Sequence, residues 1–280
     1  MSFKLTFLAL FLVSSTPVLF GEDAAPTVLK DIPYESDTNP HQTLDLYLPD
    51  TKPAPLVLWV HGGGWKSNDK SWVLVPYLVA KGYAVASINY RYSSEAIFPA
   101  QIQDANDALN FLLHHAEEYG LDKNRVAVAG DSAGGHLALL LGLARDEGGF
   151  GADASVRPRA VIDFFGPTDF TVFTQPPPAG AEDVITQLLG ASPHDRPDLA
   201  KAASPVTYVT AASPPVLILH GDKDDVVPPG QSRVLADLLK KANVPAELVI
   251  VPGAGHEGPA FSSPKTQATI LRFLEQNLKP

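Results

Sequence analysis

A serine flanked by glycines is the residue best suited to chemistry in this chain. It is Ser132, within residues 130–135, which read GDSAGG. The β-branched and apolar run 125–129 predicts a buried strand before it, and the run 136–141 predicts a buried helix after it. A serine at such a turn sits on a strained backbone with its hydroxyl exposed, and the glycines two residues before and after it leave room. The spacing predicts a nucleophile at the N-terminus of a helix, where free N–H groups and a partial positive charge collect.

A serine hydroxyl is a poor nucleophile at neutral pH and needs an adjacent base. The candidate is His256, in the loop 253–258 (GAGHEG) that follows the last predicted strand. The glycines around it give the loop the freedom to bring the imidazole over Ser132. Activity is therefore expected to fall as the pH drops through about 6.5, where an ordinary histidine becomes protonated.

The acid that would orient this histidine lies in the loop 220–228 (HGDKDDVVP), after the preceding predicted strand. Asp222 is close to the strand end, and we expect it to hold the loop by hydrogen bonds. Asp224 and Asp225 both remain candidates on physical grounds alone. The chain order serine, aspartate, histidine is that of the α/β-hydrolase fold.

A second glycine cluster follows the apolar run 56–60, in residues 61–65 (HGGGW). Glycines at the carboxyl end of a strand let backbone N–H groups face a ligand without interference from side chains. This arrangement is typical of oxyanion holes, which bind the negative charge that develops during acyl transfer.

Alternating strands and helices must position these groups. The run 44–48 alternates as an antiparallel strand does, and the others are continuous apolar runs typical of strands buried on both faces. The sequence predicts a mostly parallel central sheet flanked by helices, with the candidate residues at the carboxyl ends of the strands. A small lid-like insertion is expected at 168–212, after the expected strand 160–165. Expected strands cover 44–48, 56–60, 83–88, 125–129, 160–165, 216–219 and 247–251, and expected helices cover 99–119, 182–189, 231–242 and 266–278.

Several stretches spread over most of the chain resemble the α/β-hydrolase family of carboxylesterases, and more closely its bifunctional acetylxylan esterase/feruloyl esterase branch. The resemblance implies the α/β-hydrolase fold and a serine carboxylic-ester hydrolase. In relatives with the H-G-x-x-D-x-x-V-P loop the acid is the aspartate three residues after the glycine, which here is Asp224. The matching stretches are 61–65, 84–91, 98–104, 130–136 and 220–228.

The mechanism implied is two-step acyl transfer. His256 takes the proton of Ser132 as it attacks the ester carbonyl, while Asp224 holds the imidazole tautomer. The oxyanion is expected to bind the N–H groups of Ala133, Gly63 and Gly62. Water activated by the histidine then releases the acid. This chemistry needs neither a metal ion nor an organic cofactor.

Aromatic residues near these motifs are candidate substrate contacts, namely Trp65, Phe165 and Phe170. They suit a feruloyl ring or a sugar, although each ring equally suits packing in the core. The expected substrates are acetyl or feruloyl esters of plant polysaccharide, or similar short or aromatic acyl esters. Formamidases share the H-G-G-x-W arrangement and some serine peptidases share the Asp-x-Asp-Asp loop, so both activities remain alternatives. A non-catalytic binding protein of this fold is a third.

Composition limits the location and partners of the chain. Its 280 residues carry a formal net charge of −10, and no basic stretch is present to bind nucleic acid. Residues 1–21 hold one lysine followed by a short apolar run, which predicts a signal peptide and secretion or periplasmic export, without stable membrane insertion after processing. Residues 22–280 are expected to form one catalytic domain. The absence of cysteine excludes disulfides and a thiol nucleophile. The sequence does not indicate an oligomeric state.

Overall fold

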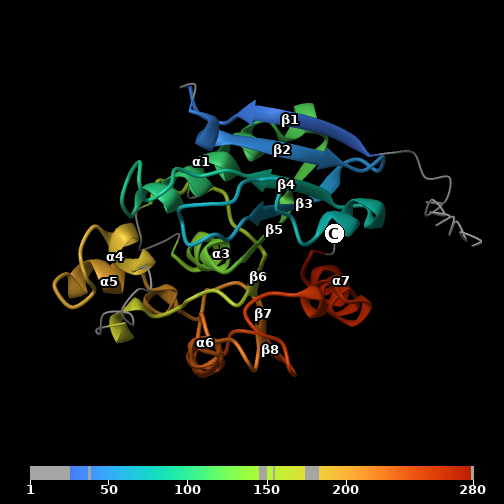
Figure 1. Ribbon diagram of the computed structural model, residues 1–280. Coiled ribbons are helices and arrows are strands. Elements are labelled where there is room, and N and C mark those ends of the chain that lie inside the picture. Colours follow the sequence, from blue (N-terminus) through green and yellow to red (C-terminus); the bar gives the residue numbers. More distant parts are fainter. Residues whose placement is uncertain (1–25, 37–38, 145–149, 154, 174–182, 279–280) are drawn as a thin grey trace, which may run out of the picture.

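The computed structural model describes residues 26–36, 39–144, 150–153, 155–173 and 183–278. Within these residues the chain forms one eight-stranded sheet with helices on both faces (Figure 1). The strands are β1 (Thr27–Pro33), β2 (Thr43–Leu48), β3 (Ala54–Val60), β4 (Ala84–Ile88), β5 (Leu121–Asp131), β6 (Ala160–Phe164), β7 (Val216–Gly221) and β8 (Ala246–Val251). The predicted signal peptide, 1–21, lies outside the described residues.

The strand order is β1-β2-β4-β3-β5-β6-β7-β8. β1 pairs with β2, and β2 with β4, in antiparallel fashion, whereas all later neighbours are parallel. The sheet therefore runs from the blue antiparallel edge to the red β8 edge in Figure 1. This arrangement confirms the predicted fold, and it brings the carboxyl ends of β3, β5, β7 and β8 to the same edge.

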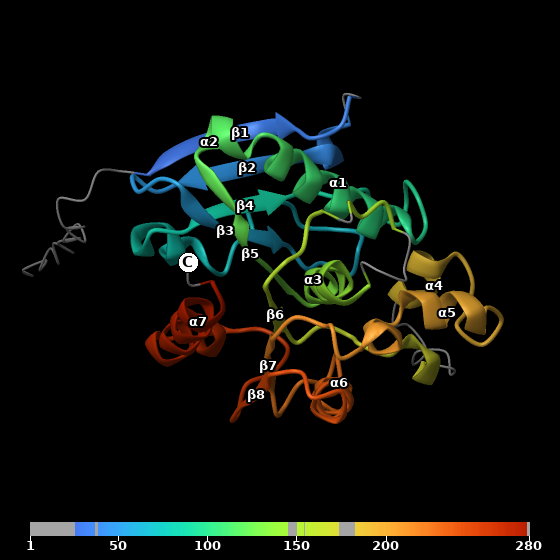
Figure 2. The same cartoon turned by 180° about the vertical axis from the view of Figure 1, so that it is seen from behind.

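Two hydrophobic cores lie on opposite faces of the sheet. The sequence of β3 is apolar throughout because both faces of this strand are buried. Leu56, Leu58 and Val60 point into one core, while Val57 and Trp59 point into the other. The first core is covered by α1, α3 and α6, and the second by the 3₁₀ turn Pro76–Lys81 and by α7 (Figure 2). The α-helices are α1 (Ala100–His114), α2 (Ala116–Tyr119), α3 (Ala133–Leu143), α4 (Val184–Leu189), α5 (Pro197–Ala203), α6 (Gly230–Lys241) and α7 (Pro264–Asn277).

The helix expected at 99–119 is in fact two helices. The backbone leaves helical geometry at His115, which has φ −100° and ψ 18° and separates α1 from α2. Its ring lies against Phe111, with centroids 4.3 Å apart, and its Nδ1 donates to the Phe111 carbonyl oxygen at 2.8 Å. The Phe111 carbonyl oxygen also accepts the His115 backbone N–H at 3.1 Å, so the helical bonds continue up to His115 and the helix ends there. Apolar periodicity does not reveal this break.

The segment after β6 contains α4 and α5, joined by irregular chain, and in Figure 1 these helices lie away from the sheet. α4 corresponds to the short helix expected at 182–189.

An ion pair fixes the connection that precedes α1, because Arg91 donates to the fully buried Asp104 at 2.7 Å.

Candidate active site

The turn between β5 and α3 has the strained geometry that the glycine spacing predicts. Ser132 has φ 52° and ψ −117°, outside the regions that a serine ordinarily occupies. A Cβ on Gly130 would lie 2.3 Å from the carbonyl oxygen of Gly134, and a Cβ on Gly134 would lie 2.0 Å from that of Val60. Only glycine fits at these two positions, because β3 and the start of α3 pass directly against the turn.

His256 stands between Ser132 and Asp224. Its Nε2 lies 2.8 Å from Ser132 Oγ, and its Nδ1 lies 2.8 Å from Asp224 Oδ2. The structure thus brings the three predicted residues together from the ends of β5, β7 and β8. Asp225, the alternative acid, is exposed to solvent. Asp222 accepts from Gly253 N at 2.7 Å, which is the loop-holding role expected for it.

The carboxylate of Asp224 is surrounded by N–H donors. Oδ1 accepts from the backbone N–H groups of Val226 and Val227, at 2.9 and 2.8 Å, and Oδ2 also lies 3.1 Å from His220 Nε2. Burial by itself would raise the pKa of Asp224, but the hydrogen bonds from His220, His256 and Val227 bring that pKa well below its usual value. The carboxylate is therefore charged wherever a histidine beside it could act as a base.

His220 is a positioning residue that the sequence reasoning did not single out. It is fully buried, its Nε2 lies 2.8 Å from the Val227 carbonyl oxygen, and its Nδ1 lies 2.6 Å from Ser232 Oγ. A ring held on both nitrogens fixes the loop that carries Asp224. His220 is the first residue of the motif 220–228, and this position in the motif could have identified it as a residue that positions Asp224.

The oxyanion loop differs from the prediction at Gly62. The Gly62 N–H donates to Asp131 Oδ1 at 2.9 Å and is not free to bind an oxyanion. The next two glycines have the positive φ values of 105° and 60° that glycine permits. Their N–H groups make no hydrogen bond within the described residues, so Gly63 stays a candidate donor and Gly64 replaces Gly62. Ala133 opens α3, where a backbone N–H has no partner within the helix.

The three aromatic rings expected to contact substrate are buried instead. The exposed fractions are 3% for Trp65, 1% for Phe165 and zero for Phe170. Trp65 donates from its indole N–H to His136 Nδ1 at 3.2 Å, and the His136 ring is held at its other nitrogen by the Ala203 carbonyl oxygen at 2.7 Å. Buried rings tied to neighbours in this way leave almost no surface for a ligand, so these residues support the site from within.

These buried rings have two different supporting positions. Phe170 packs against Trp65 and His136, with ring centroids 5.8 and 4.8 Å apart, and so joins the insertion to the oxyanion loop. Phe165 lies beneath His256, with centroids 4.8 Å apart, and touches Phe261 at 4.7 Å. Sequence alone left packing and substrate contact equally open at these residues, and burial decides for packing.

Asp131, the residue before the serine, was also missed. It is 1% exposed, and besides the Gly62 N–H it accepts the indole N–H of Trp72 on Oδ2 at 3.1 Å. Burial raises the pKa of Asp131 to about 7, against the effect of these two hydrogen bonds, and the nearby charge of Glu257 adds to the increase. One carboxylate thus joins the oxyanion loop, the nucleophile turn and Trp72.

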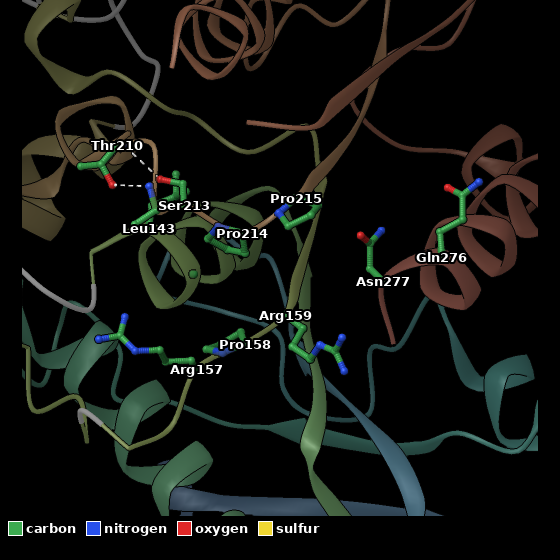
Figure 3. Close-up of a pocket in the computed structure, with 12 residues that line it drawn as sticks. Leu143, Arg157, Pro158, Arg159, Thr210, Ser213, Pro214, Pro215, Gln276 and Asn277 are labelled. Atoms are coloured by element: carbon green, nitrogen blue, oxygen red, sulfur yellow. Dashed lines mark hydrogen bonds between the residues drawn. The ribbon is translucent and has the colours of Figure 1, made fainter. Parts of the chain in front are cut away.

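A cavity of about 390 Å³ lies away from these residues. It is bordered by the end of α3, the chain entering β6 and β7, and the end of α7 (Figure 3). Arg159, Ser213 and Gln276 are among its lining residues, and none of the residues around Ser132 is.

In the described part of the chain, no group of three or more His, Cys, Asp or Glu residues is placed to hold a metal ion. None of the helices described there has both the length and the apolar character needed to cross a bilayer.

Comparison with known proteins identifies the family of this chain. The BD-FAE family model matches residues 44–239. The chain is 32% identical to "Esterase LipC" of Mycobacterium tuberculosis over 273 residues, which cover 92% of this chain and 64% of that protein. It thus spans less than two thirds of the length of this relative.

Two solved structures have the same fold. A truncated form of a carbohydrate esterase from gut microbiota is 33% identical, with a TM-score of 0.83 over 92% of this chain and 98% of the other. A bifunctional GH43-CE protein of Bacteroides eggerthii is 31% identical, with a TM-score of 0.82 over 90% of this chain and 35% of the other. Fold and relatives together define an α/β-hydrolase whose relatives include esterases. Within that class, the chain belongs to the BD-FAE family.

Proposed function

We propose that the protein is a serine carboxylesterase that removes short acyl groups, acetyl foremost, from plant polysaccharide. The observation that carries the proposal is the position of His256, within 2.8 Å of both Ser132 Oγ and Asp224 Oδ2. A base held between a nucleophile and an orienting carboxylate is the arrangement that acyl transfer requires.

In the proposed mechanism, Ser132 Oγ attacks the ester carbonyl carbon while its proton passes to His256 Nε2. Asp224 holds the imidazole with its proton on Nδ1 and stabilises the imidazolium that forms. The carbonyl oxygen becomes an oxyanion bound by the N–H groups of Gly63, Gly64 and Ala133. Proton transfer from His256 then releases the alcohol and leaves an acyl-enzyme. Water, deprotonated by the same histidine, attacks that ester and releases the acid.

Acetyl is favoured over feruloyl by the burial of the predicted aromatic contacts. A feruloyl ring needs an apolar slot lined by accessible side chains, whereas Trp65, Phe165 and Phe170 are each at most 3% exposed. A short acyl group needs only the space over the oxyanion loop. The carbohydrate esterases among the structural relatives support a saccharide as the alcohol.

We further propose that the protein acts after export, in the periplasm or outside the cell. Residues 1–21 support this location through their lysine and short apolar run. In either place the protein would have access to a polysaccharide substrate.

The test is the ratio of kcat/KM for methyl ferulate to kcat/KM for para-nitrophenyl acetate, measured on the chain lacking residues 1–21. We expect strong turnover of the acetyl ester and a very small ratio. A ratio near unity would replace acetyl by feruloyl as the acyl group. Failure to hydrolyse either ester would refute the esterase proposal and lead to assays on formanilides and peptides.

A further inference from the structure

Trp72 is the tryptophan of this chain that faces solvent. Its exposed fraction is 41%, whereas Trp59 and Trp65 are 0% and 3% exposed. A tryptophan ring carries a large apolar surface, and leaving much of it in water forfeits the burial that normally stabilises it. An exposed indole beside a candidate nucleophile is therefore a candidate binding surface.

Hydrogen bonds hold Trp72 at two points. The indole N–H of Trp59 donates to the Trp72 carbonyl oxygen at 2.7 Å, and the indole N–H of Trp72 donates to Asp131 Oδ2 at 3.1 Å. Water can satisfy the N–H of an exposed indole, but here a buried carboxylate does so. The ring is consequently fixed before any ligand arrives, which lowers the entropy lost on binding.

The anchor places Trp72 at one end of the oxyanion loop. A Cβ built on Gly62 would lie 2.7 Å from Asp131 Oδ2 and 3.2 Å from Ser132 Cβ, so the atom that holds Trp72 and the nucleophile flank the same residue. At the other end of the loop, a Cβ on Gly64 would lie 3.4 Å from Val184 Cγ1. The insertion therefore covers the Gly64 end and leaves the Gly62 end to Trp72.

A charged residue lies near Asp131, the residue that holds the Trp72 indole. Glu257 is exposed and directly follows His256, and its charge acts on Asp131, the carboxylate that holds the indole. An apolar ring face with a carboxylate nearby matches a sugar ring, which has a face of C–H groups and hydroxyl donors around its rim. Carboxylates make strong hydrogen bonds to such donors.

We propose that the exposed face of Trp72 is a platform on which a sugar ring of the alcohol stacks, with Glu257 accepting hydrogen bonds from that sugar. This proposal rests on the esterase function proposed above and specifies its alcohol side. An open platform suits a polymeric alcohol, since the rest of the polysaccharide can extend into solvent. The acyl group then lies toward the insertion, at the Gly64 end of the loop.

Two substitutions separate stacking from support of Asp131. Trp72→Phe keeps a flat ring but lacks the N–H, and Trp72→Leu keeps apolar bulk without a ring. The measured quantity is the ratio of kcat/KM for acetylated xylotriose to kcat/KM for para-nitrophenyl acetate. Any effect passed through Asp131 acts on both substrates and cancels in this ratio.

We expect Trp72→Leu to lower the ratio about tenfold, mainly through KM for the saccharide, as loss of one aromatic anchor typically does. Trp72→Phe should keep the ratio within about threefold of the wild type, because the flat ring remains. Equal losses on both substrates, or an unchanged ratio in Trp72→Leu, would overturn the platform and leave Trp72 as a support for Asp131 alone.

Calorimetric binding of xylotriose to the Ser132→Ala variant tests the platform without turnover. Binding is expected in Ser132→Ala, and its loss is expected when Trp72→Leu is added. Val234→Ala, a change at a 46% exposed residue of α6, is the matched control and should leave binding intact. If the wild type hydrolyses para-nitrophenyl acetate while Ser132→Ala binds no xylotriose, the platform fails and the esterase proposal stands. If Ser132→Ala binds xylotriose through Trp72 but the wild type hydrolyses no ester, the esterase proposal fails instead.

Discussion

Replacing Asp224 by asparagine changes one atom and should reverse the tautomer of His256. The asparagine carbonyl oxygen must take the place of Oδ1, because two N–H groups, those of Val226 and Val227, point at that position from 2.9 and 2.8 Å. The amide NH₂ then faces His256 Nδ1, which lies 2.8 Å from Oδ2. An NH₂ group can only donate, so Nδ1 must accept and Nε2 must carry the proton. Nε2 can then no longer take the proton of Ser132.

The expected loss is about four orders of magnitude in kcat, or about 5.5 kcal/mol of transition-state stabilisation, as measured for the same change in the serine protease triad. Asp225→Asn is the matched control one residue away. Its side chain is exposed and makes no hydrogen bond within the described residues, so kcat/KM should stay within about twofold of the wild type.

The assay is para-nitrophenyl acetate hydrolysis at pH 8, with the melting temperature of each variant recorded to show that both fold. Comparable losses in the two variants would contradict the assignment. So would an Asp224→Asn variant that keeps more than about a tenth of wild-type kcat, since a reversed tautomer cannot act as the base.

Three further predictions concern the nucleophile, a buried carboxyl and a buried ion pair. Ser132→Ala should fold normally and lose nearly all turnover, and retained turnover would remove Ser132 as the nucleophile. The pKa of Asp131 is raised from 3.8 to about 7 by burial, so the folded state binds an extra proton between these pH values and loses stability as pH rises toward 7. The free energy of unfolding of the wild type should fall by about 3 kcal/mol between pH 5 and 8, and Asp131→Asn should remove this fall. Urea unfolding at both pH values measures it, and an equal fall in the two proteins would contradict the prediction. Arg91→Met should cost about 3 kcal/mol, because it leaves the fully buried Asp104 without its cation, and calorimetry that shows an unchanged melting temperature would refute this.

The sequence pattern was sufficient for the fold, for Ser132 and for His256, whereas the choice of Asp224 over Asp225 needed the family resemblance. Each of these residues follows an apolar run that reads as a strand, and parallel strands bring their carboxyl ends to one edge. The glycine pattern around Ser132 is equally local, because the backbone of that turn admits no side chain at Gly130 or Gly134. Local constraints of this kind leave a direct mark on the amino-acid sequence.

Contacts between distant segments were not accessible in the same way. The direction of the Gly62 N–H depends on the path of its loop and on the carboxylate of Asp131, 69 residues away. The burial of Trp65 likewise depends on His136 and Phe170, which approach it from α3 and from the insertion. The sequence shows that an aromatic ring or a backbone N–H is present at a motif. Only the packing of several elements decides which atoms that group faces.

Asp131 shows how such long-range packing bears on chemistry. A buried carboxyl group with a pKa near 7 lowers stability at neutral pH, whereas an apolar side chain in its place would not. What the carboxylate provides is one fixed point for two donors from separate parts of the chain, the Gly62 N–H and the indole of Trp72. The first contact sets which N–H groups of the oxyanion loop are left for the ester, and the second fixes the exposed ring beside it. Protonation of this one group therefore bears on both the oxyanion loop and the proposed saccharide platform.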